Sequence, residues 1–199
     1  MKSAIILAGG KGTRFRSQKQ FVDFYGKKLY QHVYDKVVDL VDEVIIVGVD
    51  VKAGVTRTES VLNGLSRLSQ HSSKVVILEA ARPLVFKNQI IKLLESKSNS
   101  SSFSVPMVET IIINGCNYPN RNICLSFQTP QAFNTKMLIE AYKNGNFNDM
   151  TDETRVIYEY YNELPELLTG GPNLTKVTYP EDLILLESIM KIYNIKIDE

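Results

Sequence analysis

The stretch SAIILAGGKGTR, residues 3–14, indicates how the rest of the chain is built. Its first half, residues 3–8, is a short apolar run of the kind that forms a parallel strand buried on both faces. Glycines follow at Gly9, Gly10 and Gly12, where backbone N–H groups can turn toward an anion without a side chain in the way. The stretch therefore predicts a buried strand that ends in an anion-binding loop.

Three cations surround this loop, namely Lys11, Arg14 and Lys19. Glycine-rich backbone together with clustered basic side chains is typical of a site for a nucleoside triphosphate. A glycine-rich turn that only joins a strand to the next element is the alternative, because such turns are common after strands.

Two frequent phosphate-binding motifs do not fit these residues. A Walker loop requires Gly where Ile5 stands and Ser or Thr where Gly12 stands. A dinucleotide fingerprint requires a third glycine where Phe15 stands. The loop is therefore neither a P-loop nor a dinucleotide-binding turn.

Apolar runs and helical patterns alternate along the rest of the chain. This alternation predicts an α/β fold with a doubly wound, mostly parallel Rossmann-like sheet, whose ligands bind at the carboxyl ends of the strands. A turn-rich segment with two apolar stretches predicts a protruding β-hairpin arm at 109–127, and Thr178–Glu181 predicts a capping box at the last helix. We expect further strands at 43–48, 74–79 and 103–107, and helices at 29–40, 57–68, 88–96, about 134–144 and 151–162.

Length and charge limit the classes of function. A chain of 199 residues with 44% hydrophobic side chains fits a single domain spanning 1–199. A net charge of +1 offers neither a broad basic surface for nucleic acid nor a polybasic membrane anchor. Cys116 and Cys124 form no zinc motif, and the first apolar run is too short for a signal peptide, so we expect a cytoplasmic protein.

Several motifs occur in the order found in one known enzyme family. The chain resembles the 2-C-methyl-D-erythritol 4-phosphate cytidylyltransferases, which serve isoprenoid biosynthesis, and the related ribitol 5-phosphate cytidylyltransferases. This resemblance covers essentially the whole chain and implies a nucleotide-diphospho-sugar transferase type of fold. It rests on AGGKGTRF (8–15), KQF (19–21), GVTRTESVLNGL (54–65), LEAARP (78–83), VPMVET (105–110), QTPQAF (128–133), MTDET (150–154) and KVTYPEDL (176–183).

The reaction that the resemblance implies is transfer of CMP from CTP to a small polyol phosphate, with release of pyrophosphate and with Mg²⁺ as cofactor. A phosphate monoester already carries nearly two negative charges at neutral pH, because its second pKa is about 6. The reaction therefore needs no general base. It needs cations that offset the charges of two phosphates and hold them in line.

The resemblance assigns most of the motif residues to the nucleotide. The backbone of Ala8 and the three loop glycines would contact the base and the phosphates. Arg57 and Ser60 would lie near the cytosine and ribose, although helix capping explains Ser60 equally well. The residues implied in catalysis are Arg14, Lys19 and Lys176.

Glu79 is the main departure from the family pattern, which has Asp as the carboxylate beside magnesium at this position. The extra methylene moves the oxygens by about 1 Å, and magnesium tolerates poor geometry badly. Glu79 either keeps the metal contact with some adjustment, or serves the acceptor, or is purely structural.

The resemblance defines the acceptor-binding part of the site less well than the nucleotide-binding part. Arg82, Arg121 and Thr129 match residues that meet the acceptor, and the resemblance implies a homodimer in which the 109–127 hairpin reaches the neighbouring subunit. The hairpin and the region around 49–57 are both shorter than in the family. A cytidylyltransferase for another capsule or cell-surface sugar or polyol phosphate, and a catalytically silent nucleotide-binding dimer, are therefore alternatives.

Overall fold

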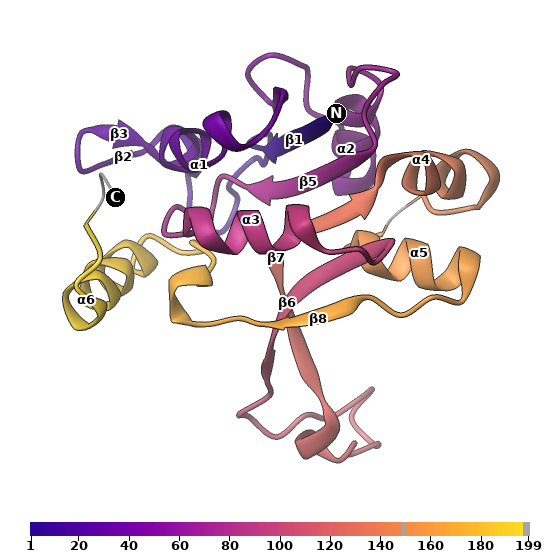
Figure 1. Cartoon of the computed structure of the whole chain (residues 1–199). Coiled ribbons are helices and arrows are strands. Elements are labelled where there is room, and N and C mark those ends of the chain that lie inside the picture. Colours follow the sequence, from indigo (N-terminus) through magenta and orange to yellow (C-terminus); the bar gives the residue numbers. More distant parts are fainter. Residues whose placement is uncertain (149, 197–199) are drawn as a thin grey trace.

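A mixed sheet forms the centre of the molecule in the computed structural model, which describes residues 1–148 and 150–196 (Figure 1). In this part of the chain the strand order is β4-β1-β5-β7-β6-β8. Only β7 runs antiparallel to its neighbours, so the expected mostly parallel sheet is confirmed. The strands are β1 (Lys2–Leu7), β4 (Glu43–Val47), β5 (Lys74–Glu79), β6 (Ser100–Pro106), β7 (Leu125–Asn134) and β8 (Glu166–Thr169).

Helices cover both faces of the sheet because the central strands are apolar on both sides. In β1, Ile5 and Ile6 are both fully buried and point into different hydrophobic clusters. Helices α1 (Leu29–Val37) and α3 (Lys87–Glu95) pack on the Ile6 side. Helices α2 (Arg57–Leu65), α4 (Thr135–Asn144) and α5 (Glu153–Tyr161) pack on the Ile5 side.

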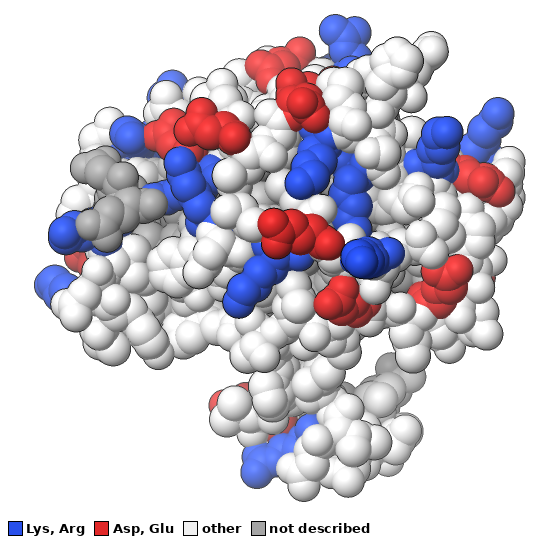
Figure 2. Space-filling model, viewed as in Figure 1, with Lys and Arg blue, Asp and Glu red and all other residues white. Residues whose placement is uncertain are grey.

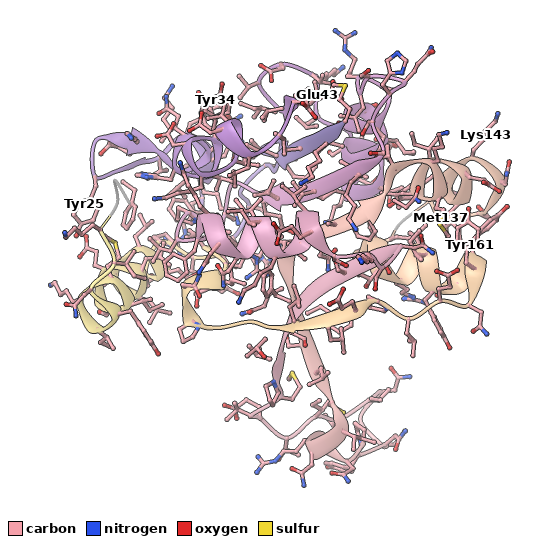
Figure 3. The ribbon with its side chains drawn as sticks, viewed as in Figure 1. Tyr25, Tyr34, Glu43, Met137, Lys143 and Tyr161 are labelled. Atoms are coloured by element: carbon pink, nitrogen blue, oxygen red, sulfur yellow. The ribbon has the colours of Figure 1, made fainter. Side chains whose placement is uncertain are left out.

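Helices α4 and α5 lie side by side, and one contact between them is visible in Figure 3. The Tyr161 hydroxyl donates a hydrogen bond of 3.3 Å to the carbonyl of Met137, so the end of α5 is joined to the first turn of α4. This arrangement places the beginning of α5 beside the sheet near β6.

The last helix, α6 (Asp182–Tyr193), closes a third hydrophobic cluster that includes Phe15 and Val177. Its start differs from the expected capping box. Asp182 accepts hydrogen bonds from the N–H groups of Thr178 and Tyr179, whereas Glu181 makes no side-chain cap. The capping prediction was therefore wrong, because the helix begins at Asp182, after the whole of the expected box.

The sequence analysis did not predict some of the regular elements of this fold. Strands β2 (Asp23–Phe24) and β3 (Lys27–Lys28) form a small hairpin, and β8 forms an edge of the main sheet. Strand β7 was recognised only as a motif. Short 3₁₀ helices also occur at η1 (Lys19–Phe21), η2 (Val38–Leu40), η3 (Arg121–Ile123) and η4 (Pro172–Leu174).

An arm projects from the sheet, as Figure 1 shows below β6 and β7. Its ladder is formed by β6 and β7 and ends at the pair Pro106–Leu125. Of the expected hairpin at 109–127, residues 125–127 are strand, as part of β7. The first expected strand was wrong, because residues 107–124 form an irregular tip with η3 and one isolated bridge between Ile113 and Asn117. Proline and turn-forming residues in this segment oppose a longer ladder.

Charged side chains do not gather into one region of the face shown in Figure 2. Lys and Arg are interspersed there with Asp and Glu. Within the described ranges, no helix has the length and apolar character needed to cross a membrane.

Candidate functional site

The loop after β1 turns across the carboxyl end of the sheet. Its start is fixed by a hydrogen bond of 2.8 Å from the Ala8 N–H to the Val47 carbonyl. A Cβ at Gly9 would lie 2.1 Å from the Ala53 Cβ, and a Cβ at Gly12 would lie 1.7 Å from the Ser17 carbonyl oxygen. Gly12 also has a φ of +62°, so this loop requires glycine at both positions.

A cavity of about 230 Å³ opens beside this loop, at the carboxyl ends of β1 and β5. Ligands of doubly wound sheets bind at this edge. The structure brings eight of the site residues that the sequence suggested to its lining, namely Ala8, Gly9, Gly10, Lys19, Arg57, Ser60, Glu79 and Lys176.

Glu79 is the carboxylate of this cavity and is only 9% exposed. Its Oε2 lies 2.5 Å from the Nζ of Lys176, and its Oε1 lies 3.7 Å from the Nε of Arg57. Burial by itself would raise the pKa of the Glu79 carboxyl, but Lys176, Arg57 and Arg82 together hold it below its ordinary value. Glu79 is therefore ionised and ringed by cations.

Lys19 is the first residue of η1 and also lines this cavity. Its Nζ donates a hydrogen bond of 2.5 Å to the carbonyl of Val177. Burial and the nearby charge of Lys176 lower the pKa of Lys19 to about 8. The cavity therefore holds more positive than negative charge, because Lys19 and Lys176 repel each other and Glu79 is the one carboxylate in its lining. Such a site favours a polyanion.

Arg14 and Gly12 do not line the cavity itself. Arg14 is exposed, and its guanidinium carbon lies 5.9 Å from the ring centroid of Tyr179. Its charge contributes to the lowered pKa of Lys19, so it lies near the rim. Arg14 can therefore reach a ligand that extends out of the cavity.

Ser60 holds the loop before α2 and does not cap the helix. Its hydroxyl accepts a hydrogen bond from the Gly54 N–H at 3.0 Å and donates one to the Thr56 carbonyl at 3.1 Å. The cap of α2 is Thr56, which accepts from the Glu59 N–H. The capping alternative for Ser60 was therefore wrong, and its side chain lies on the cavity wall.

The three residues assigned to the acceptor lie outside the cavity. Arg82 donates from Nε to the Thr129 hydroxyl at 2.8 Å, so these two residues are brought together. Arg121 lies on the arm, where its guanidinium donates to the Val108 carbonyl at 2.6 Å. The structure thus assembles the nucleotide half of the expected site more completely than the acceptor half.

Comparison with known proteins decides the family. A family model described as IspD, 2-C-methyl-D-erythritol 4-phosphate cytidylyltransferase, matches residues 3–192. The chain belongs to this cytidylyltransferase family. It is 31% identical to the enzyme of that name from Alkaliphilus oremlandii, over 95% of this chain and 94% of the relative, and 31% identical to the one from Aquifex aeolicus, over 96% and 98%.

Solved structures agree with this cytidylyltransferase assignment at the level of the fold. The crystal structure of 4-diphosphocytidyl-2C-methyl-D-erythritol synthase from Anaerococcus prevotii superposes with a TM-score of 0.82 at 23% identity, covering 96% of this chain and 98% of that one. The cytidylyltransferase from Thermus thermophilus superposes with a TM-score of 0.76 at 21% identity, covering 96% and 100%. The Rossmann-like fold is therefore shared along almost the whole length.

The described residues of this site include a single candidate carboxylate ligand for Mg²⁺, Glu79. No group of three or more His, Cys, Asp or Glu side chains that could hold a metal ion occurs between residues 1 and 196, the undescribed position 149 aside. Magnesium commonly binds one or two carboxylates together with substrate phosphates, and Glu79 fits that role. A metal would compete with Lys176 for the oxygens of Glu79.

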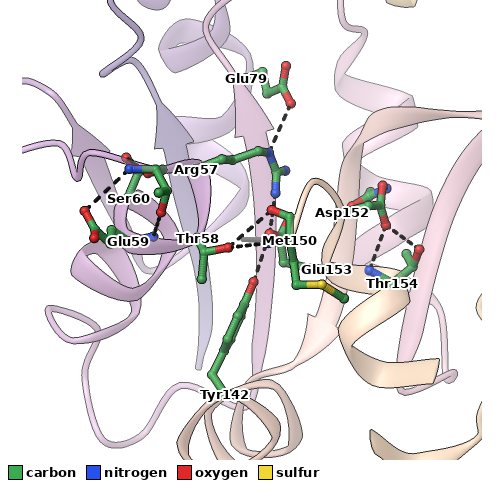
Figure 4. Close-up of polar contacts among 12 residues, drawn as sticks. Arg57, Thr58, Glu59, Ser60, Glu79, Tyr142, Met150, Asp152, Glu153 and Thr154 are labelled. Atoms are coloured by element: carbon green, nitrogen blue, oxygen red, sulfur yellow. Dashed lines mark hydrogen bonds and ion pairs between the residues drawn. The ribbon is translucent and has the colours of Figure 1, made fainter. Parts of the chain in front are cut away.

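One residue behind the cavity was missed by the sequence reasoning, namely Glu153, the first residue of α5. Its carboxylate accepts from the Arg57 guanidinium, and Figure 4 shows Arg57 lying between Glu153 and Glu79. A signal was present in the sequence, because Glu153 shares a helical face with Val156 and Ile157, which are buried. A carboxylate on an apolar stripe indicates a buried partner.

Proposed function

We propose that this member of the cytidylyltransferase family transfers CMP from CTP to 2-C-methyl-D-erythritol 4-phosphate and releases pyrophosphate. The observation that carries this proposal is the gathering of Lys19, Lys176 and Arg57 beside the glycine loop, in one cavity at the carboxyl ends of β1 and β5. The curated relatives named above bear this activity in their names and are covered almost completely by the chain.

In the proposed reaction, a phosphate oxygen of the acceptor attacks the α-phosphorus of CTP. A bond forms between this oxygen and the α-phosphorus, and the bond from the α-phosphorus to the bridging oxygen breaks, so pyrophosphate leaves with that oxygen. Lys19 and Lys176 offset the charge that grows on the leaving group, and Arg14 extends this field at the rim. The backbone of residues 8–12 holds the nucleotide in line.

We propose that Mg²⁺ enters the site together with CTP and that Glu79 is the protein ligand. When bound, the metal neutralises phosphate charge and favours in-line geometry. The short salt bridge between Glu79 and Lys176 supports a carboxylate that stays ionised and aimed into the cavity.

A pyrophosphate-release assay with a panel of acceptors tests the proposed function. We expect CTP with 2-C-methyl-D-erythritol 4-phosphate to give the highest kcat/KM, and ATP, GTP and UTP to be poor donors. Ribitol 5-phosphate and other sugar or polyol phosphates are the comparison acceptors. A clear preference for any of these would reassign the acceptor, and CTP binding without turnover on any acceptor would contradict catalysis.

The lowered pKa of Lys19 predicts a pH dependence. Because kcat/KM for CTP reports ionisations of the free enzyme, it should fall about tenfold per pH unit as Lys19 loses its proton above about pH 8. The groups whose charges act on Lys19 are Lys176, Glu79, Arg14 and Asp182. Initial rates from pH 6 to 10 measure the profile. Lys19→Arg should remove the decline, because a guanidinium stays charged, whereas an unchanged decline would exclude Lys19 as the titrating group.

We propose further that the enzyme is a homodimer in which the arm of one chain completes the site of the other. The described part of the arm exposes several large apolar side chains, which a partner surface would cover. A two-fold interface buries the same patch from both chains, so a second copy is the simplest partner. The exposed apolar residues of this segment include Val108, Ile112, Ile113, Tyr118, Ile123, Leu125 and Phe127.

Mixed dimers test this arrangement. Arg121→Ala alone and Lys19→Ala alone should each be weak, and mixing the two chains should restore part of the activity, because one of the two mixed sites then carries neither change. Chain exchange is verified by native mass spectrometry of tagged chains. A monomer at assay concentration, or no rescue after proven exchange, would show that the arm serves its own subunit.

A further inference from the structure

A chain of charges runs from the cavity into the interior. Lys176 contacts Glu79. Glu79 contacts Arg57, and the Arg57 guanidinium donates to Glu153 (Figure 4). The two ends of this chain differ in exposure, because the Lys176 side chain is 40% exposed and the Glu153 side chain is fully buried. Arg57 therefore lies between one carboxylate in the cavity and one carboxylate behind it.

Glu153 sits in surroundings that make a buried charge costly. One oxygen, Oε1, accepts from Arg57 and from the Tyr142 hydroxyl at 3.1 Å, while Oε2 is buried and receives no hydrogen bond from the residues that the structure describes. Burial raises the pKa of the Glu153 carboxyl, and Arg57 opposes that rise. A carboxylate at this buried position is costly, so we expect Glu153 to have a role other than packing.

Joining α2 to the start of the α5 region is not that role, because a separate contact already ties α2 to Met150, in the segment just before α5. The Thr58 hydroxyl accepts from the Met150 N–H at 2.8 Å and lies 3.3 Å from the Met150 carbonyl. Glu153 instead acts on Arg57, a cation that also contacts the cavity carboxylate Glu79. Without Glu153, the Arg57 guanidinium would be drawn wholly toward Glu79.

Resting on the proposed function, we infer that Glu153 and Tyr142 are positioning residues that hold Arg57 in place for the nucleotide. Glu153 fixes one end of the guanidinium, and Tyr142 fixes the carboxylate that does so. The other end of Arg57 stays available to Glu79 and to the cavity. Misplacing such a group reduces turnover even though the mutated residue never touches the substrate.

Glu153→Gln tests the inference because it keeps the shape and removes the charge. We expect kcat/KM for CTP to fall by about 10-fold to 10²-fold, with KM for the acceptor changed less than about twofold. Calorimetry should show weaker CTP binding. The matched control is Glu159→Gln, an exposed carboxylate of α5 that pairs only with Arg155 in the described contacts and should leave all these values unchanged.

A double-mutant comparison shows whether Glu153 works through Arg57. In an Arg57→Lys background the ammonium cannot bridge both carboxylates, so adding Glu153→Gln should cost less than about threefold. An equal loss in both backgrounds, or a folded Glu153→Gln variant with normal CTP kinetics, would overturn the inference.

If Glu153→Gln does not fold, Tyr142→Phe tests the same positioning role. We expect a loss of about threefold to tenfold in kcat/KM for CTP, and normal kinetics in this variant would overturn the inference. If wild-type protein shows no transfer, the proposed function has failed. The CTP dissociation constants of the same variants then judge the positioning role separately.

Discussion

Lys19→Ala is expected to lower kcat by about 10²-fold to 10³-fold while the fold stays intact. In the proposed reaction the Lys19 ammonium offsets charge that grows on the leaving pyrophosphate, and removing one such preorganised contact typically costs this much. The fold should persist because only one hydrogen bond, to the Val177 carbonyl, is lost, at a cost of about 1 kcal/mol, and repulsion with Lys176 is relieved.

Steady-state kinetics and thermal unfolding of the same preparations measure this prediction. Lys143→Ala is the matched control, because it removes an exposed lysine in the last turn of α4 and should change neither quantity. Arg14→Ala should also lower kcat, by about 10²-fold, through the same loss of positive field. Near-normal turnover of Lys19→Ala with an unchanged thermal midpoint would remove Lys19 from the catalytic cluster.

Glu79→Gln is the second change with a large expected effect, a loss of activity of about 10²-fold or more. The neutral amide is a weak magnesium ligand, and it leaves Lys176 and Arg57 without their shared anion. Loss of this anion should lower the folding stability, so the assay must be run well below the thermal midpoint.

A magnesium titration of activity separates a metal role from a purely electrostatic one. Wild-type protein should be inactive in EDTA and recover with Mg²⁺, whereas Glu79→Gln should need far more Mg²⁺ or not recover. Glu79→Asp is the matched variant, which keeps the charge and should retain most of the activity. Full activity of the Gln variant at ordinary magnesium would show that Glu79 is not a metal ligand.

The sequence predicted the fold well where local pattern and burial agree. The run at residues 3–8 and the strand at 74–79 are apolar on both faces, so their parallel pairing follows from pattern alone. Most of strand β7 was not predicted as a strand. Its direction is set by its position between β5 and β6, and the local sequence pattern carries no information on that position. The arm was predicted as a segment, but its ladder lies nearer the body than its apolar stretches suggested.

The site was predictable only in part for a similar reason. The loop glycines and the cations beside them are close in the sequence, whereas Arg57, Ser60, Glu79 and Lys176 were suggested only by the family resemblance; all four of these line the cavity. Glu153 lies 96 residues from Arg57, so their contact exists only in the folded chain. Arg82 and Thr129 lie together in the fold, whereas Arg121 contacts only the arm in the described contacts, and its acceptor role stays a prediction.

Transfer of labelled CMP tests the central claim most directly. The enzyme is incubated with α-³²P-labelled CTP, 2-C-methyl-D-erythritol 4-phosphate and Mg²⁺, and the labelled products and pyrophosphate are counted. We predict one labelled CMP group joined to the acceptor for each pyrophosphate released, with Lys19→Ala about 10²-fold slower or more. Labelled CTP that binds yet stays intact, or label that appears only as free CMP, would contradict the account.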